Sequence, residues 1–394
     1  MTNVNKKMYE LGNEGSAIRE LFEYGKKRKL EIGDDNVFDF SIGNPSAKVP
    51  EKLTKTLKEL LDNEDIHSYT SNVGDNKTRE NIAKYLSSTY NTYIDKNLIY
   101  MTCGASASLF LAFNALVESE DDEIILFAPF FPEYRVFIEK TGAKVVVVDP
   151  DYDHFEINFD DLDRKINKNT KAVVINFPNN PTGAIITNKT LEKLSNYLKD
   201  KEKQYNKVIY LISDEPYREI IYDGNVCPFV TNYYDDSIVC YSYSKALSLA
   251  GERIGYTLVN PKAKEAENVF KAICGAGRSL GFVCAPSLFQ KAVGLNQGLL
   301  CNINEYKENR DILVNNLTKL GYEFVYPKGA FYLFVKAFEN DDIAFSKKAM
   351  KHELLLVPSS SFGIKGYVRV SYCVKKEVII NSYDAFKKLK EEYK

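Results

Sequence analysis

Short apolar runs alternate with longer amphipathic stretches through the middle of the chain. Each run is only four to six residues long, which is typical of buried strands rather than helices. We expect strands over residues 98–102, 123–127, 144–148, 172–177, 208–212 and 238–241. Because a helical segment separates most successive strands, the pattern predicts an α/β fold with a mainly parallel, doubly wound sheet and helices on both faces.

The flanking segments follow other patterns. Apolar positions at helical spacing predict helices over residues 16–29, 50–61 and 75–90, and alternation predicts a short strand over residues 37–42. Later in the chain we expect helices around 262–275, 285–297 and 302–320, strands near 332–335 and 367–371, and a charged terminal helix. We therefore expect a large domain over residues 45–290 and a smaller α+β domain formed by residues 1–44 and 291–394.

Composition restricts the possible partners and location. Fifty-two Lys and Arg against 54 Asp and Glu leave a net charge of −2, so nothing favours a nucleic acid or an anionic membrane as partner. The N-terminus is polar and no apolar run approaches membrane-spanning length, so we expect a cytoplasmic protein. The seven cysteines show no C-x-x-C spacing and the three histidines lie far apart, so we expect no metal site.

The stretch from Ser242 to Tyr256 contains the strongest chemical signal. Lys245 lies between hydroxyl groups, and Arg253 follows eight positions later. A lysine amine forms a Schiff base with a carbonyl, and serines with an arginine bind phosphate; pyridoxal 5'-phosphate (PLP) carries both groups. The alternative for this stretch alone is a serine-rich loop with a solvated lysine.

Other candidate residues follow predicted strands. Gly104, Ala105 and Ser106 open a helix, where backbone N–H groups and the helix dipole favour an anion. Asp214 directly follows an apolar strand, where a doubly wound sheet places residues that contact ligands. A carboxylate roughly 3 Å from a ring nitrogen is worth several kcal/mol, enough to keep a pyridinium protonated. The structural alternatives are a tight turn at Gly104 and a helix cap at Asp214.

Four motifs occur in a telling order: Asn180-Pro-Thr-Gly, Asp214-x-x-Tyr217, Ser242-x-Ser-Lys245 and Arg253-x-Gly255. Together they resemble fold-type-I PLP enzymes of the class I/II, aspartate-aminotransferase-like family, and the resemblance spans almost the whole chain. It implies that Lys245 carries the internal aldimine and then moves the proton. It also implies that Asp214 pairs with the pyridine nitrogen of the cofactor.

The resemblance assigns further residues by position. Asn180 and Tyr217 would contact the phenolate oxygen, and Phe131 would stack on the ring. The cofactor phosphate would be bound by Gly104, Ala105, Ser106, Ser242, Arg253 and, from a neighbouring subunit of a homodimer, Tyr69. From the residues alone, Phe131 between two prolines is equally a core plug, and Asn180 equally part of a simple turn.

Two arginines would bind the substrate if the resemblance holds. Arg369 would clamp the α-carboxylate, with Gly43 and Asn180 close by; the alternative is a surface ion pair. Arg278 lies 25 residues beyond Arg253, close to where aspartate-using relatives supply an arginine for the substrate side chain. The alternative for Arg278 is a helix-terminal arginine that caps carbonyls or bridges a dimer.

The resemblance therefore predicts a PLP-dependent aminotransferase that moves an amino group between an L-amino acid and a 2-oxo acid, with aspartate or glutamate as candidate substrates. A carbon–sulfur β-lyase shares the same cofactor site and stays as the first alternative. A PLP-binding regulator without turnover is the second. Such regulators carry an N-terminal DNA-binding domain, whereas only about 40 residues precede the cofactor fold here, without a helix-turn-helix or a basic patch.

Overall fold

The computed structural model describes residues 3–13, 15–62, 64–153, 155–281 and 283–394, which form two compact units. The larger unit comprises Pro45–Lys307 and Lys328–Ala330, and the smaller comprises the chain up to Asn44, Glu308–Pro327 and Phe331–Lys394. The sequence placed the second boundary near residue 290. Helix α11 (Ser287–Leu295) packs against α3 (Glu51–Leu61) and α4 (Asn76–Tyr90), and so the larger unit extends beyond that point.

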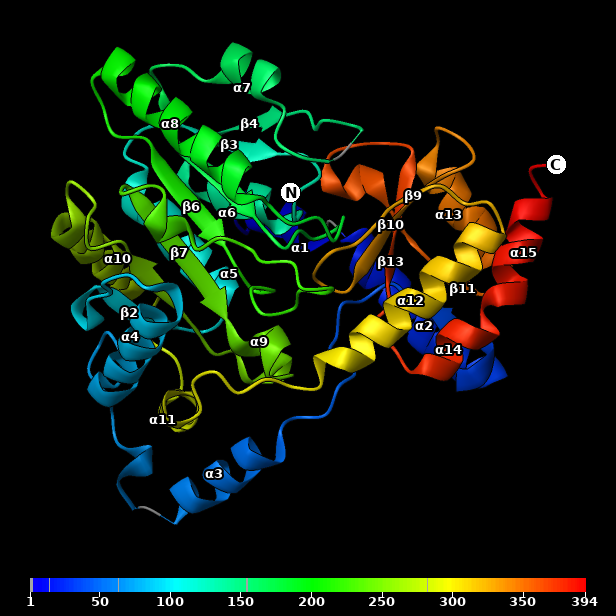
Figure 1. Cartoon of the computed structure of the whole chain (residues 1–394), viewed down its shortest axis with the longest axis horizontal. Helices are drawn as coiled ribbons and strands as arrows, with labels where there is room; N and C mark the ends of the chain where they lie inside the picture. Colours follow the sequence, from blue (N-terminus) through cyan, green and yellow to red (C-terminus); the bar gives the residue numbers. More distant parts are fainter. Residues whose placement is uncertain (1–2, 14, 63, 154, 282) are drawn as a thin grey trace. The chain divides into compact units, whose positions relative to one another are not determined.

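Within the described residues, a sheet of seven strands forms the centre of the larger unit, in the order β2-β8-β7-β6-β5-β3-β4 (Figure 1). The strands are β2 (Ile99–Thr102), β3 (Glu123–Phe127), β4 (Lys144–Val148), β5 (Thr170–Asn176), β6 (Tyr210–Asp214), β7 (Ser237–Ser242) and β8 (Gly255–Val259). Neighbours are parallel except for β8, which pairs antiparallel with β2 and β7. The predicted mainly parallel sheet is confirmed, but β8 was not predicted.

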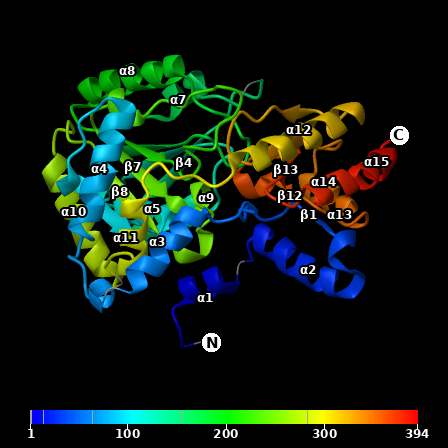
Figure 2. The ribbon, with the colours of Figure 1, turned by 60° about the horizontal axis from the view of Figure 1, so that its bottom comes forward.

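Helices cover the sheet of the larger unit, and Figure 2 shows α8 (Asn188–Tyr205) and α5 (Ala105–Leu116) on opposite sides of the strands. Leucines at helical spacing in α8 are buried against strand residues. Helix α5 is apolar on nearly all sides because α6 (Glu133–Thr141) and α10 (Ala266–Leu280) also pack on it. Two further helices are α7 (Phe159–Lys165) and the short α9 (Tyr243–Ala246).

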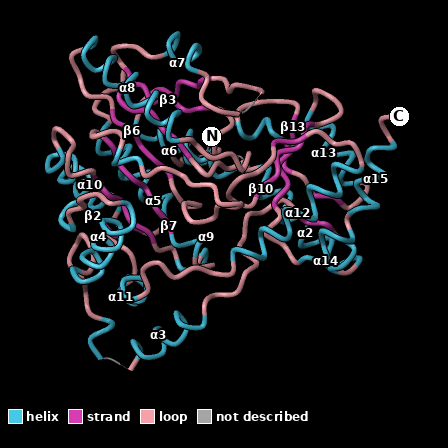
Figure 3. The backbone as a smooth tube through the Cα atoms, viewed as in Figure 1, coloured by secondary structure: helices cyan, strands magenta, loops and turns pink. Residues whose placement is uncertain are grey.

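In the smaller unit, a second sheet has the order β12-β13-β10-β9 and is antiparallel throughout (Figure 3). Its strands are β9 (Phe324–Val325), β10 (Tyr332–Lys336), β12 (Val357–Pro358) and β13 (Tyr367–Ser371). The other elements here are α1 (Lys6–Asn13), α2 (Ala17–Ile32), β1 (Phe38–Asp39), β11 (Leu354–Leu355), α13 (Asp342–Met350), α14 (Lys376–Asn381) and α15 (Tyr383–Glu391). Helix α12 (Ile303–Lys319) begins in the larger unit and ends in the smaller one.

The strand expected over residues 37–42 is shorter than predicted. Only Phe38 and Asp39 form β1, which pairs in parallel with β11. Beyond Asp39 the backbone bonds differently: the carbonyl of Phe40 accepts from the N–H of Ser371, and that of Ser41 accepts from Arg369. Helix α1 was also not predicted, because it contributes no buried residue to a core. None of the described helices has both the length and the apolar character needed to cross a membrane.

Candidate active site

Asp214 ends the buried strand β6, and its two carboxylate oxygens have different surroundings. The hydroxyl of Tyr134 donates to Oδ2 at 2.5 Å. Oδ1 is buried and has no hydrogen-bond partner among the described residues. Burial raises the pKa of Asp214 to about 7, while the bond from Tyr134 lowers it and the nearby charge of Glu215 adds to the rise. Because an unpartnered buried anion is costly, Oδ1 suits a cationic hydrogen-bond donor.

Asn176 connects Asp214 to the predicted turn at Asn180. It ends β5, directly opposite Asp214 in the strand register. Its Nδ2 donates to the carbonyl of Asp214 at 2.9 Å, and its Oδ1 accepts from the backbone N–H of Asn180 at 2.9 Å. Phe131 packs edge-on against Tyr134, with ring centroids 5.6 Å apart. The structure thus brings Phe131, Asp214 and Asn180 together through two residues.

The sequence interpretation missed both connecting residues. Asn176 was detectable, since it is a polar residue at the carboxyl end of a buried parallel strand, as Asp214 is. Tyr134 lies in the first turn of α6, and nothing in its spacing relates it to Asp214 eighty positions later.

The loop with Lys245 is held by its own serines. Ser242 ends β7 and caps α9: its Oγ accepts from the N–H of Ser244 at 3.1 Å and donates to the Ser244 hydroxyl at 2.7 Å. Lys245 is half-buried in α9, and its Nζ lies 5.9 Å from the ring centroid of buried Tyr217. The predicted nucleophile and one predicted ring contact therefore lie together.

The predicted phosphate residues also meet. Arg253 donates from Nη1 to the Ser244 hydroxyl and from Nη2 to the Cys103 carbonyl, both at 3.4 Å. Gly104 has a φ of 80°, and a Cβ there would come within 2.8 Å of Nη2 of Arg253. Ala105 follows in the first turn of α5, next to Ser106. Helix N–H groups beside a guanidinium form an anion site. Ser244, one of the serines that flank Lys245, also belongs to this cluster, although the resemblance did not assign it to the phosphate.

Tyr69 and Arg278 lie on the surface of the larger unit. Tyr69 is fully exposed in the loop before α4, and Arg278 is exposed in the last turn of α10. Both side chains are therefore accessible for contact with another molecule.

Gly43 and Arg369 belong to the smaller unit, where both contact Tyr332. Arg369 in β13 is buried, so the alternative of a surface ion pair is wrong. Its Nη2 donates to the carbonyl of Ser41 at 2.5 Å, and its guanidinium lies 4.6 Å from the ring centroid of Tyr332 and 5.0 Å from that of Phe362. A Cβ at Gly43 would collide with the Tyr332 hydroxyl at 2.0 Å.

Comparison with known proteins identifies the family. The model of the family "aminotransferase class I and II" matches residues 35–385. The chain belongs to this family. It is therefore an aminotransferase of a PLP-dependent family, and the predicted family, fold and enzyme class are confirmed.

Individual relatives cover nearly the whole chain. The aspartate aminotransferase of Pyrococcus horikoshii is 32% identical over 391 residues, covering 95% of each chain. The aromatic-amino-acid aminotransferase 2 of Thermococcus litoralis is 28% identical over 398 residues, covering 96% of each chain. The crystal structure of an aminotransferase from Eubacterium rectale superposes with a TM-score of 0.97, at 51% identity over 100% of both chains.

Proposed function

We propose that this aminotransferase binds PLP in its larger unit, with Lys245 as the point of covalent attachment. The observation that carries the proposal is the Asp214 carboxylate. One oxygen is held by Tyr134, and the other is buried without a partner among the described residues. A protonated pyridine nitrogen is a cationic donor that would satisfy that oxygen. The ion pair would also lower the pKa of Asp214 from its raised value and keep the carboxylate ionised.

The cluster at the start of α5 fits the phosphate of the same cofactor. A phosphate ester carries nearly two negative charges and needs several donors. Arg253 supplies a guanidinium, the hydroxyls of Ser242 and Ser244 adjoin it, and Ala105 and Ser106 present the N–H groups of a helix start. Gly104 has a φ of 80°, which disfavours any residue with a Cβ, and the close approach of Arg253 supports a backbone cradle.

The remaining ring contacts follow from the same arrangement. We assign Phe131 to the face of the cofactor ring. Its side chain packs against Tyr134, and Tyr134 is hydrogen-bonded to Asp214. We assign Asn180 and Tyr217 to the phenolate oxygen. Asn180 is held by Asn176, next to Asp214, and the ring of Tyr217 lies 5.9 Å from Nζ of Lys245.

The chemistry divides between the cofactor and three side chains. Bound PLP supplies the electron sink that makes the substrate Cα–H bond acidic. Lys245 would hold and move the proton at the substrate Cα, as a general base and then a general acid. Asp214 would keep the ring nitrogen protonated, so that the ring can accept electrons. Tyr217 would orient the phenolate side of the ring.

For the substrate we propose a dicarboxylic amino acid and its 2-oxo acid partner. Arg369 would bind the α-carboxylate through a bidentate pair, beside Gly43. Arg278 would bind the second carboxylate across a homodimer, in which the partner subunit's Tyr69 would also reach the phosphate. The exposure of Arg278 and Tyr69 supports contact with a second subunit. A relative named for aspartate supports the substrate class, whereas a relative named for aromatic amino acids makes those the alternative.

Borohydride reduction of the PLP-loaded protein, followed by peptide mapping, tests the attachment site. We expect the label on Lys245, and no label after Lys245→Ala. Lys264→Ala is the matched control. It removes a lysine of the larger unit that pairs with Glu202 and Asp236, and it should keep full labelling. A label on another lysine in the wild type would contradict the proposal.

A further inference from the structure

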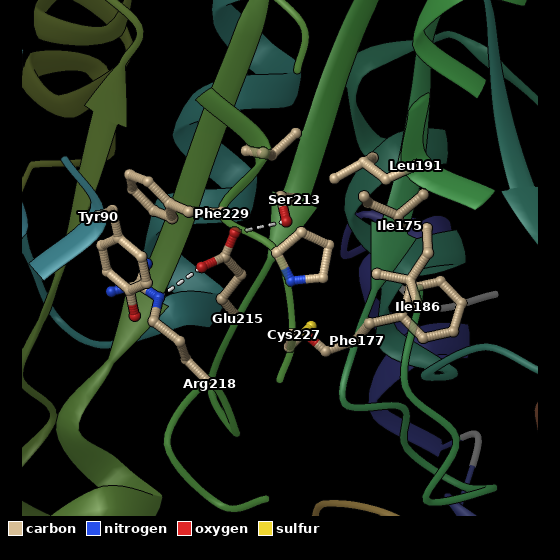
Figure 4. A pocket seen from close by; sticks show the side chains of 12 residues that line it. Tyr90, Ile175, Phe177, Ile186, Leu191, Ser213, Glu215, Arg218, Cys227 and Phe229 are labelled. Carbon is tan, nitrogen blue, oxygen red and sulfur yellow. Dashed lines mark hydrogen bonds and ion pairs between the residues drawn. The ribbon is translucent and has the colours of Figure 1, made fainter. Parts of the chain in front are cut away.

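A second group of buried polar residues lies on the other side of the strand ends that carry Asp214 and Ser242. Side chains alternate between the two faces along a strand. Ser213 and Glu215 therefore point away from Asp214, and the Ser213 hydroxyl indeed donates to Oε1 of Glu215 at 2.7 Å. Figure 4 shows these two side chains beside Arg218, lining a small cavity.

Arg218 is the centre of this group. Its Nε donates to Oε2 of Glu215 at 2.5 Å, and its Nη1 donates to the hydroxyl of Tyr256 at 2.8 Å. The side chains of Arg218 and Glu215 are both only 6% exposed. Arg218 thus joins a residue just after β6 to one in β8, by donating from two directions of one planar group. A lysine presents a single ammonium and cannot reproduce this fork.

Aromatic rings surround the guanidinium. Its carbon lies 4.3 Å from the ring centroid of Tyr241 and 5.1 Å from that of Phe229, within the range of cation–π attraction. Tyr241 pairs with Tyr256 across β7 and β8, and their rings stack at 4.9 Å. Tyr243, the first residue of α9, packs edge-on against Tyr241 at 5.0 Å. The contacts therefore run from Arg218 to the helix that carries Lys245.

Stability alone does not account for this arrangement. Apolar side chains of similar volume are usually at least as stabilising as a buried ion pair, because burying the charges is costly. What the pair does provide is a fixed geometry between neighbouring strand ends. Glu215 adjoins Asp214, Tyr241 and Tyr243 flank Ser242, and Tyr256 follows Gly255.

We infer that Arg218 is a positioning residue for the cofactor site: through Glu215, Tyr256 and the aromatic rings, it fixes the ends of β6, β7 and β8, and so the spacing of Asp214 and Lys245. The inference rests on the proposed PLP site. It predicts that loss of the arginine fork loosens that site even where the fold survives.

The test compares Arg218→Lys and Tyr256→Phe with the wild type. We would measure the Kd of the cofactor-free protein for PLP, the pH midpoint of the absorbance change of the bound cofactor, and amide hydrogen exchange over residues 241–246 without cofactor. For Arg218→Lys we expect the Kd for PLP to rise about tenfold, because the substitution removes one charged hydrogen bond. We also expect a shifted midpoint and faster exchange. Tyr256→Phe, which keeps the ring, should show the same changes to a smaller extent.

Arg310→Lys is the matched control. Arg310 is a buried arginine of the smaller unit that donates to Asp311. Its replacement should lower stability without changing PLP affinity or the midpoint. The inference fails if Arg218→Lys has the PLP affinity and the pH midpoint of the wild type, or if Arg310→Lys shifts these two quantities equally. If Arg218→Lys does not fold, an unchanged Tyr256→Phe protein also overturns it. A wild type that binds no PLP overturns the proposed function and this inference together.

Discussion

Replacing Asp214 with asparagine is expected to stabilise the cofactor-free protein at neutral pH while weakening its binding of PLP. Asparagine keeps the shape of the side chain and an acceptor for the Tyr134 hydroxyl. It removes a negative charge that is buried and lacks a partner on one oxygen among the described residues. The same charge would pair with the ring nitrogen of PLP, so its loss should cost cofactor affinity and several orders of magnitude in transamination rate.

The raised pKa sets the size and pH dependence of the stabilisation. Asp214 ionises near pH 7 in the folded chain, against a usual value of 3.8. The contribution of the protonated carboxyl to the free energy of unfolding is fully present below about pH 4, and it is lost as the pH rises through about 7. A rise of roughly three pKa units corresponds to about 4 kcal/mol. The free energy of unfolding of Asp214→Asn, relative to that of the wild type, should therefore increase by roughly 2–3 kcal/mol from pH 5 to pH 8.

Urea unfolding of the cofactor-free proteins at pH 5 and pH 8 measures this difference. Asp161→Asn is the control with the opposite sign. Burial alone would raise the pKa of Asp161, but hydrogen bonds from Lys165, the Asp149 backbone and Arg164 outweigh burial and lower it. That variant should lose stability at pH 8. A difference between Asp214→Asn and wild type that does not change with pH would refute the reasoning, as would an Asp214→Asn protein less stable than wild type at pH 8.

Three further predictions concern single side chains. Tyr134→Phe removes the hydrogen bond that lowers the pKa of Asp214, so this pKa should rise further. In urea unfolding of the cofactor-free protein, the decrease of stability with pH should then extend to higher pH. Mixing inactive Lys245→Ala and Tyr69→Ala proteins should restore part of the activity; no recovery in demonstrably mixed dimers would argue against shared sites. In assays with 2-oxoglutarate, Arg278→Ala should lose a ten- to hundredfold preference for aspartate and glutamate over alanine, roughly the value of one charge-assisted pair. A uniform change across donors would remove Arg278 from the substrate site.

The sequence predicts the core of the larger unit well because its signals are local. The apolar run at 123–127 coincides with β3, since a buried parallel strand must be apolar on both faces. The run at 144–148 coincides with β4, although this edge strand is only partly buried. Strand β8 was missed although it is an apolar run of the same kind. It begins at Gly255, inside the stretch interpreted as a cofactor loop.

The site was predicted only in part, for a related reason. Motif residues such as Asp214 and Lys245 can be recognised from their neighbours in sequence. Tyr134 and Asn176, which bind Asp214, act through contacts that depend on the strand order and on the path of the loops. Spacing along the chain contains no information on such contacts, so they appear only in the folded structure.

The discontinuity of the smaller unit has a consequence for synthesis on the ribosome. Phe38 in β1 pairs with Leu354 in β11, 316 positions later. At ordinary elongation rates, roughly 20–60 s pass between the translation of Phe38 and that of its partner. The whole larger unit emerges in the interval and can fold as a body. Because β1 is only two residues long, the waiting segment offers little exposed strand edge for association with other nascent chains.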